Sequence, residues 1–273
     1  MSITIQINYK EYPECMFAVI AAYLPSWQGQ DLRRVAGDVV FKYQDKYGNT
    51  YKNGQLHSYD DKPAVVKEER QEWYKDGDLH RDGDLPAVIV EGDNERREWF
   101  KNGKRNREGD KPAIMTRTIR EWYENDEHHR LDDKPCYIGL YLGYYLWKVN
   151  GKFYREGDKP SFVVEYTRTQ WWHNKDGKLH RDGDLPAMIE GDYQAWYQNG
   201  FIHRDNDLPA IIDPRTNKQV WYQNGDRHRE GGKPAIIQGE KKSYYLNGRE
   251  VKKAKATSKK ATKSKKATKS KKQ

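Results

Sequence analysis

The chain has 273 residues, of which 35% are hydrophobic and 33% charged, and it carries 20 tyrosines and 9 tryptophans. This composition is too aromatic for a disordered chain and too poor in aliphatic residues for one thick globular core. The formal charge of +9 is uneven: residues 252–273 hold 11 lysines and no acid, so residues 1–251 carry 9 − 11 = −2. A strongly basic folded body is therefore excluded, and thin layers are favoured because Tyr and Trp pack one edge while their polar atom stays wet.

Cysteine usage and hydropathy favour a protein that stays inside cells. Cys15 and Cys136 lie far apart in the sequence, and neither has other potential metal ligands nearby. This argues against a disulfide framework. The apolar residues around Met16–Leu24 lack the basic leader and cleavage site of a secretory signal. The longest apolar run, Cys136–Trp147, has 12 residues, fewer than the ~20 that cross a bilayer. We expect no membrane span and no secretion.

Residues 1–45 do not repeat and are predicted to form a strand plus a helical cap. Met1–Tyr9 alternates apolar and polar residues, as half-buried strands do. Helical spacing of apolar residues predicts a helix over Glu14–Leu24 and a second over Gln30–Lys42, with Pro25 between them.

Residues 46–251 are occupied by about eight to nine repeats of one phrase, in full Trp-aromatic-x-Asn-Gly-x-x-His-Arg-x-x-Asp-x-Pro-Ala-x-Ile. Successive turn positions lie 23–26 residues apart. Such a period marks a repeat architecture, in which each unit buries its apolar face only against its neighbours. The turn positions are Gly54, Gly77, Gly103, Asp126, Gly151, Gly177, Gly200, Gly225 and Gly248.

Each repeat is predicted to contain a tight β-hairpin. In Trp73–Val90, Asp76-Gly77 separates two short strands, and Asp-Gly or Asn-Gly is the strongest short-range hairpin signal. A second turn follows, and Pro86 opens a third strand. The predicted fold is all-β: an antiparallel hairpin array, a meander or solenoid-like single sheet with the repeat tryptophans buried. Those tryptophans are Trp73, Trp99, Trp122, Trp196 and Trp221.

Two places depart from the phrase. Asp126 stands where the turn has Gly, and a residue with a Cβ should strain it. Cys136–Trp147 is apolar on both alternation sets, which predicts a strand covered on both faces, by a dimer contact or by the N-terminal helices.

The recurring polar residues favour structural roles over chemistry. A row of single histidines does not supply the three or four converging ligands that zinc needs, and the slot is filled twice by Asn or Tyr. The arginine after it is expected to bridge an aspartate across the second turn or in the neighbouring repeat; a ladder of free arginines gripping phosphates is the alternative. We find no catalytic motif and expect no enzyme, no metal and no cofactor. The histidines are His57, His80, His129, His180, His203 and His228; the arginines are Arg81, Arg107, Arg130, Arg155, Arg181, Arg204 and Arg229; the aspartates are Asp61, Asp84, Asp110, Asp133, Asp158, Asp184 and Asp207.

Residues 252–273 are predicted to be a disordered lysine-rich tail, because they have no apolar residue larger than alanine and repel one another. Flexible cations bind polyanions without sequence preference, so the tail is a candidate for nucleic-acid contact; a nuclear-import signal or a solubilising segment are the alternatives. The candidate residues are Lys252, Lys253, Lys255, Lys259, Lys260, Lys263, Lys265, Lys266, Lys269, Lys271 and Lys272.

The phrase Trp-Tyr-x-Asn-Gly-x-x-His resembles the membrane-occupation-and-recognition-nexus (MORN) repeat, over roughly residues 51–251. With His-Arg-x-x-Asp-x-Pro-Ala it is closer to a divergent MORN-like repeat of large DNA viruses of protists and of phages. The resemblance implies β-hairpin arrays used for binding and scaffolding, without catalytic residues. Ordinary MORN units have Gly where this chain has Arg after the histidine slot, so lipid binding is not carried over.

The N-terminus resembles an F-box, with Pro13 and Tyr23 at that motif's spacing. This resemblance implies that a Skp-type adaptor of a ubiquitin ligase is bound and that the repeats read the substrate. A helical cap that shields the open edge of the first repeat is the equal alternative. The residues that would face the adaptor are Phe17, Ile20, Leu24 and Leu32.

Together these patterns predict a non-enzymatic scaffold or protein-interaction protein, viral by its resemblance, in the host cytoplasm or nucleus or in a virion. An F-box-like adaptor of a cullin-RING ubiquitin ligase and a virion-associated structural protein are the alternatives.

Overall fold

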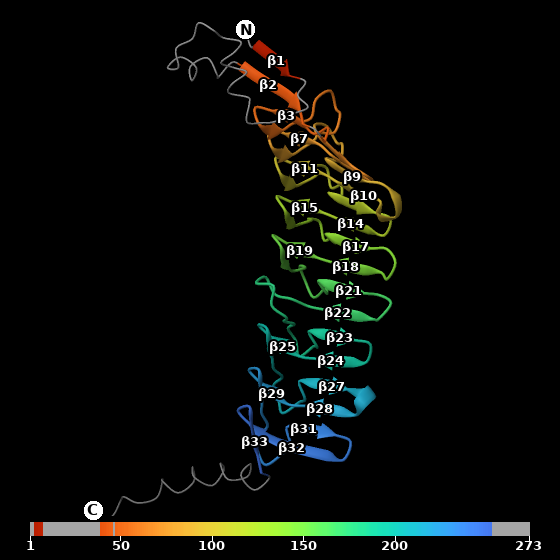
Figure 1. Ribbon diagram of the computed structural model, residues 1–273. Helices are drawn as coiled ribbons and strands as arrows, with labels where there is room; N and C mark the ends of the chain where they lie inside the picture. Colours follow the sequence, from red (N-terminus) through yellow and green to blue (C-terminus); the bar gives the residue numbers. More distant parts are fainter. Residues whose placement is uncertain (1–2, 8–38, 46, 253–273) are drawn as a thin grey trace, which may run out of the picture. The chain divides into compact units, whose positions relative to one another are not determined.

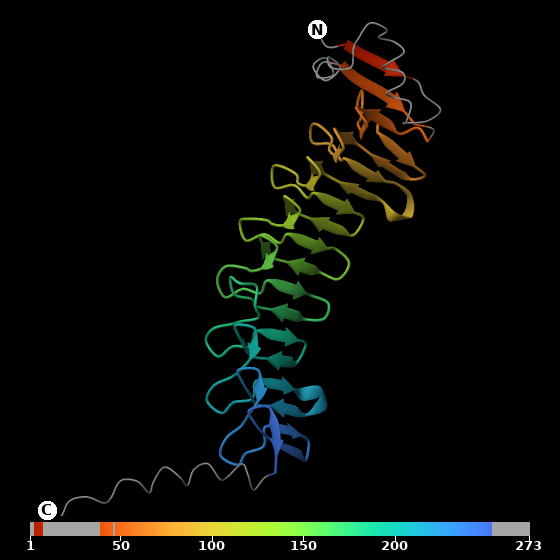
Figure 2. The same cartoon turned by 60° about the vertical axis from the view of Figure 1, so that its left-hand side comes forward.

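The computed structural model describes residues 3–7, 39–45 and 47–252 (Figures 1 and 2). The predicted helix over Glu14–Leu24 and the tail beyond Lys252 lie outside these residues. The chain divides into two compact units, Met1–Glu127 and His128–Gln273, and each is described by itself. No helix in the described part is long and apolar enough to cross a membrane.

The first unit begins with a four-stranded sheet and continues as an antiparallel meander. β1 (Ile3–Ile7) pairs in parallel with β2 (Val39–Gln44), which is followed by β3 (Thr50–Lys52) and β4 (Gln55–Leu56). The predicted strand over Met1–Tyr9 is thereby confirmed. The strands of the larger sheet are β5 (Val65–Lys67), β6 (Arg70–Glu72), β9 (Val88–Val90), β10 (Arg96–Glu98), β13 (Ile114–Thr116) and β14 (Ile119–Glu121), with the 3₁₀ turn η2 (Gly92–Asn94) between β9 and β10.

In the second unit the same antiparallel pattern runs through the large sheet. Its strands are β17 (Tyr137–Gly139), β18 (Tyr144–Leu146), β21 (Phe162–Val164), β22 (Thr169–Trp171), β23 (Met188–Glu190), β24 (Tyr193–Ala195), β27 (Ile211–Asp213), β28 (Lys218–Val220), β31 (Ile236–Gln238), β32 (Lys241–Leu246) and β33 (Arg249–Val251), with the 3₁₀ turn η3 (Pro214–Thr216) between β27 and β28. The predictions of an all-β fold and of an antiparallel meander are confirmed.

Between the strands of the large sheets, the tight turns form separate two-stranded hairpins, which stack in a column of their own in each unit (Figure 1). The hairpins of the first unit are β7 (Tyr74–Lys75) with β8 (Asp78–Leu79) and β11 (Phe100–Lys101) with β12 (Lys104–Arg105); β15 (Tyr123–Glu124) and β16 (Glu127–His128) follow at the boundary. Those of the second are β19 (Lys148–Val149) with β20 (Lys152–Phe153), β25 (Tyr197–Gln198) with β26 (Phe201–Ile202) and β29 (Tyr222–Gln223) with β30 (Asp226–Arg227).

The backbone of each repeat tryptophan connects the large sheet to the hairpin. The Trp73 N–H donates to the Ala87 carbonyl in the large sheet (2.8 Å), and its own carbonyl accepts from the His80 N–H that closes the hairpin (3.0 Å). Its ring is 4% exposed, and Ala87 is fully buried. The other four predicted core tryptophans are 6–8% exposed, so the prediction that these rings form the core is confirmed. The rest of the core consists of apolar residues of the large sheet and of the small residues, mostly alanines, that pair with each Trp.

Three predictions need correction or qualification. Val39–Gln44 is the strand β2, so the helix predicted over Gln30–Lys42 is wrong at its end, where two valines and two aromatic residues favour a strand. The rest of that predicted helix, residues 30–38, lies outside the described residues. Asp126 does adopt a positive φ of 70°, but its carboxylate accepts from the Arg105 backbone N–H (3.0 Å), which offsets the cost of the turn.

The third correction concerns Cys136–Trp147, which is not one covered strand. It is a hairpin, with β17 and β18 joined by a turn that lies in solvent. Cys136 is fully buried, whereas Leu140, Tyr141 and Leu142 are all exposed. The glycines at positions 139 and 143, which bracket the turn, were the signal that the uniform apolar pattern concealed.

Candidate interaction surface

Each recurring arginine is held in a clamp made by its own chain. The Arg204 guanidinium lies 3.8 Å above the Trp196 ring and donates to both carboxylate oxygens of Asp184, at 2.8 and 3.1 Å. Asp184 belongs to the preceding repeat, and the bonds with Arg204 hold the pKa of its carboxyl below the usual value. Two bridges were predicted for these arginines, one across the second turn and one to the neighbouring repeat, and the structure has the second. The same clamp is formed by Arg81 with Asp61, Arg107 with Asp84, Arg155 with Asp133, Arg181 with Asp158 and Arg229 with Asp207.

The clamp occupies N–H donors of the guanidinium and covers one of its planar faces with a Trp ring, so little of the group is left for a ligand. The Arg204 side chain is 14% exposed and also donates to the Pro209 carbonyl (3.2 Å). Asp133 carries a second cation, Lys159, beside Arg155, and the two lower the pKa of its carboxyl to about 2. The six clamped arginines are therefore committed to the fold, and the alternative that they form a phosphate-gripping ladder is wrong for them.

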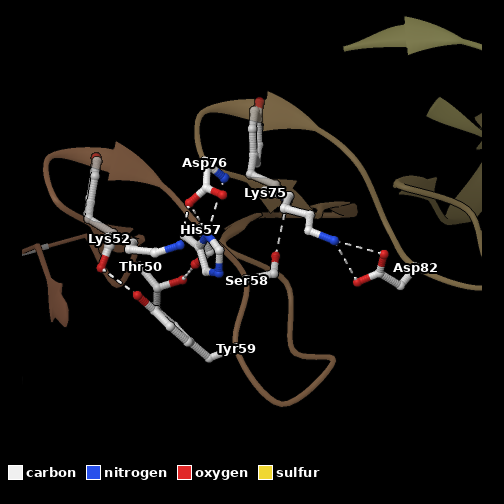
Figure 3. Close-up of polar contacts among 10 residues, drawn as sticks. Thr50, Lys52, His57, Ser58, Tyr59, Lys75, Asp76 and Asp82 are labelled. Atoms are coloured by element: carbon white, nitrogen blue, oxygen red, sulfur yellow. Dashed lines mark hydrogen bonds and ion pairs between the residues drawn. The ribbon is translucent and has the colours of Figure 1, made fainter. Parts of the chain in front are cut away.

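The recurring histidines join consecutive hairpins. His80 Nδ1 accepts from the Asn102 backbone N–H in the next repeat (3.1 Å), while its Nε2 faces Asp82 Oδ1 (3.0 Å). Figure 3 shows the first such contact, where His57 Nδ1 accepts from the Asp76 N–H (3.1 Å). Burial lowers the pKa of His57. Within the part of the chain that is described, no group of three or more His, Cys, Asp or Glu side chains is placed to hold a metal ion.

One serine–histidine pair was not foreseen. Ser161 occupies the slot that alanine fills in most repeats, and His173 occupies the slot that usually holds Tyr. Their side chains are 2.7 Å apart, and His173 stacks on Phe153. Ser161 is fully buried, so a substrate does not reach its hydroxyl. The paired departure from the repeat was the available sequence signal, and it marks a packing unit.

The exposed turns of the large sheet carry one apolar patch. Leu140, Tyr141 and Leu142 form the tip of the β17–β18 turn, and Tyr166 the tip of the next one, β21–β22; we call these four residues the tip patch. They are 55, 87, 42 and 80% exposed. The two turns are joined directly, since the Tyr166 N–H donates to the Leu142 carbonyl (3.3 Å). The remaining turns of both large sheets are rich in charged and polar residues. Single exposed apolar residues are ordinary, but a contiguous group marks an interaction site.

Beside the tip patch lies a hollow of about 590 Å³. Its wall contains Phe162 and Trp171, whose rings stack at 4.3 Å. Glu190 lines it from the neighbouring strand β23, and Arg168 and Arg215 line it as well. Arg168 comes from the same turn as Tyr166, so the hollow and the patch form one surface of the second unit.

The residues selected from the sequence as binding sites lie almost entirely outside the described part. This applies to Phe17, Ile20, Leu24 and Leu32 and to every tail lysine except Lys252, which is exposed. The tip patch was missed because the sequence pattern presented Cys136–Trp147 as a covered strand, and the hollow was missed because its lining comes from several strands and turns. No protein-family model, curated protein or solved structure matches the chain.

Proposed function

We propose that this protein is a non-enzymatic repeat scaffold that binds another protein through the tip patch. The observation that carries the proposal is the contrast between two kinds of surface. The six clamped arginines and the recurring histidines are consumed in joining repeats, whereas Leu140, Tyr141, Leu142 and Tyr166 have no role in the core. Aromatic and leucine side chains exposed together at two adjacent tips are typical of a protein-binding surface.

The test compares two variants of the full chain in a pull-down from host cells, read by quantitative mass spectrometry. In the tip variant Leu140, Tyr141, Leu142 and Tyr166 become Ser. In the matched control, exposed polar residues away from this surface, Asp93, Glu240 and Lys241, become Ser. We expect the wild type and the control to retain a partner that the tip variant loses at least about tenfold, as hot-spot removal does. Equal recovery by all three would refute the proposal.

Both variants change exposed residues, so neither should disturb the fold. We expect their free energies of unfolding to lie within about 0.5 kcal/mol of the wild type. The MORN-like resemblance of residues 51–251 is consistent with a scaffold, and a virion-associated structural role is a form of the same proposal. Recovery of a Skp-type adaptor by the wild type and by the tip variant alike would instead support the F-box-like alternative.

A second candidate function, nucleic-acid contact, concerns the tail alone. Its 11 lysines contrast with the charge of −2 over residues 1–251, and the clamped arginines are occupied. We expect full-length protein to bind duplex DNA with little sequence preference, and with a log–log salt slope near −0.9 per phosphate neutralised. A chain ending at Val251 should not bind in a gel-shift titration at two salt concentrations. Equal binding by both would place the site on the repeats; no binding would leave an import signal or a solubilising tail.

A further inference from the structure

Six of the hairpin turns carry the dipeptide Asn-Gly, the sequence most prone to spontaneous deamidation. In this reaction the glycine nitrogen attacks the side-chain carbonyl carbon of the asparagine, and the side-chain amide nitrogen leaves as ammonia. Water then opens the succinimide to aspartate or isoaspartate. All six asparagines are exposed and have φ between 48° and 50°, so neither exposure nor backbone conformation distinguishes them. They are Asn53, Asn102, Asn150, Asn199, Asn224 and Asn247.

Five of these turns are held by two backbone hydrogen bonds to the preceding repeat. The Asn224 N–H donates to His203 Nδ1 (3.0 Å), and the Gly225 N–H donates to the Ile202 carbonyl (2.9 Å). The glycine nitrogen reaches the asparagine side chain only if the peptide between the two residues rotates, and this rotation breaks the bonds. The same pair of bonds is formed at the turns of Asn102, Asn150, Asn199 and Asn247.

The first turn, between β3 and β4, has no hairpin before it. The pairing of β2 with β3 ends where Lys42 lies opposite Lys52, one residue before the turn. Among the residues that the structure describes, none accepts a hydrogen bond from the Gly54 N–H. The space beside the Gly54 Cα is also open, whereas the Phe201 side chain lies against Gly225. The peptide of the first turn can therefore rotate without losing a glycine bond to a preceding repeat.

We propose that Asn53 is the site at which the folded protein deamidates, with the Gly54 nitrogen as the nucleophile. The product adds a carboxylate next to Lys52, and isoaspartate also lengthens the backbone there. Lys52 bridges to Asp76 of the second hairpin (2.7 Å), and Asp76 also faces His57 (Figure 3). The modification therefore places a negative charge at the contact between the first two hairpins. It is independent of partner binding by the tip patch.

The test compares the six sites within one molecule. The full chain is kept at mildly alkaline pH, digested with pepsin in acid so that the digestion adds no product, and mapped by mass spectrometry. We expect Asn53 to convert at least about tenfold faster than the other five, because one hydrogen bond of ordinary net strength shifts a population by up to about tenfold. In urea, which unfolds the chain, all six should convert at similar rates. Equal rates in the folded chain, or a lead of Asn53 that persists in urea, would overturn the proposal.

A substitution tests whether the bonds between repeats protect the other turns. His203→Tyr removes the acceptor of the Asn224 N–H, and Tyr154 shows that this slot of the repeat accepts tyrosine. We expect the conversion of Asn224 to rise at least about threefold relative to that of Asn247, whose acceptor His228 is unchanged. An unchanged ratio would overturn the proposal, because the lack of such bonds would then not be what exposes the first turn to the reaction.

Discussion

Replacing Trp196 by alanine should lower the free energy of unfolding by about 3–5 kcal/mol, the cost of truncating a large buried aromatic side chain. The ring is 6% exposed, and its indole N–H donates to the Asp184 carbonyl (3.0 Å). It also supports the Arg204 guanidinium. Truncation therefore opens a cavity, leaves the Asp184 carbonyl without its indole donor and removes the ring on which the Arg204 guanidinium lies.

Urea denaturation followed by circular dichroism measures this change. Phe201→Ala is the matched control, because Phe201 is an aromatic residue of the adjacent hairpin that is 59% exposed. We expect the control to change the free energy of unfolding by less than about 0.5 kcal/mol. Each repeat contacts only its neighbours, so a broadened or split transition in Trp196→Ala would also fit a break in the array. If Trp196→Ala lowered the free energy of unfolding by less than about 1 kcal/mol, the assignment of this ring to the core would be contradicted.

The repeat phrase was sufficient to predict the elements that depend on local chemistry. Asn102-Gly103 adopts positive φ at both positions, as its dipeptide predicts. The salt bridges between repeats could be predicted because the arginine and the aspartate recur at fixed positions in the repeat. Sequence alone did not separate hairpin from sheet, since that division depends on the backbone bonds of Trp73 to two different partners.

The candidate surface was harder to predict for a physical reason. Alternation describes which residues share a face of a strand, but it does not show where a chain turns if the turn residues are apolar. Leu140, Tyr141 and Leu142 therefore looked like sheet residues. The hollow depends on Trp171 and Glu190 meeting across two strands, and strand register is not contained in either segment by itself.

Acidification should destabilise the second unit through His173. Burial lowers the pKa of this imidazole to about 4, from an ordinary value near 6.5. The folded state then disfavours the proton that the unfolded chain takes up, so stability is complete above about pH 6.5 and is lost as the pH falls toward 4. After allowance for solvent screening we expect a loss of about 2 kcal/mol over this window. Clamped carboxylates such as Asp133, whose pKa is also lowered, would add a further loss only below about pH 4.

The chain supplies its own control for this effect. The double variant Ser161→Ala with His173→Tyr restores the residues that most repeats carry in these two slots, and it removes the titrating group together with its hydroxyl partner (2.7 Å). Its free energy of unfolding, measured by urea denaturation at half-unit steps from pH 7 to 4, should fall less steeply than that of the wild type. An identical slope would exclude His173 as the source. The acid sensitivity would then be sought at His57, whose pKa burial also lowers and whose Nδ1 accepts from the Asp76 N–H only while it is unprotonated.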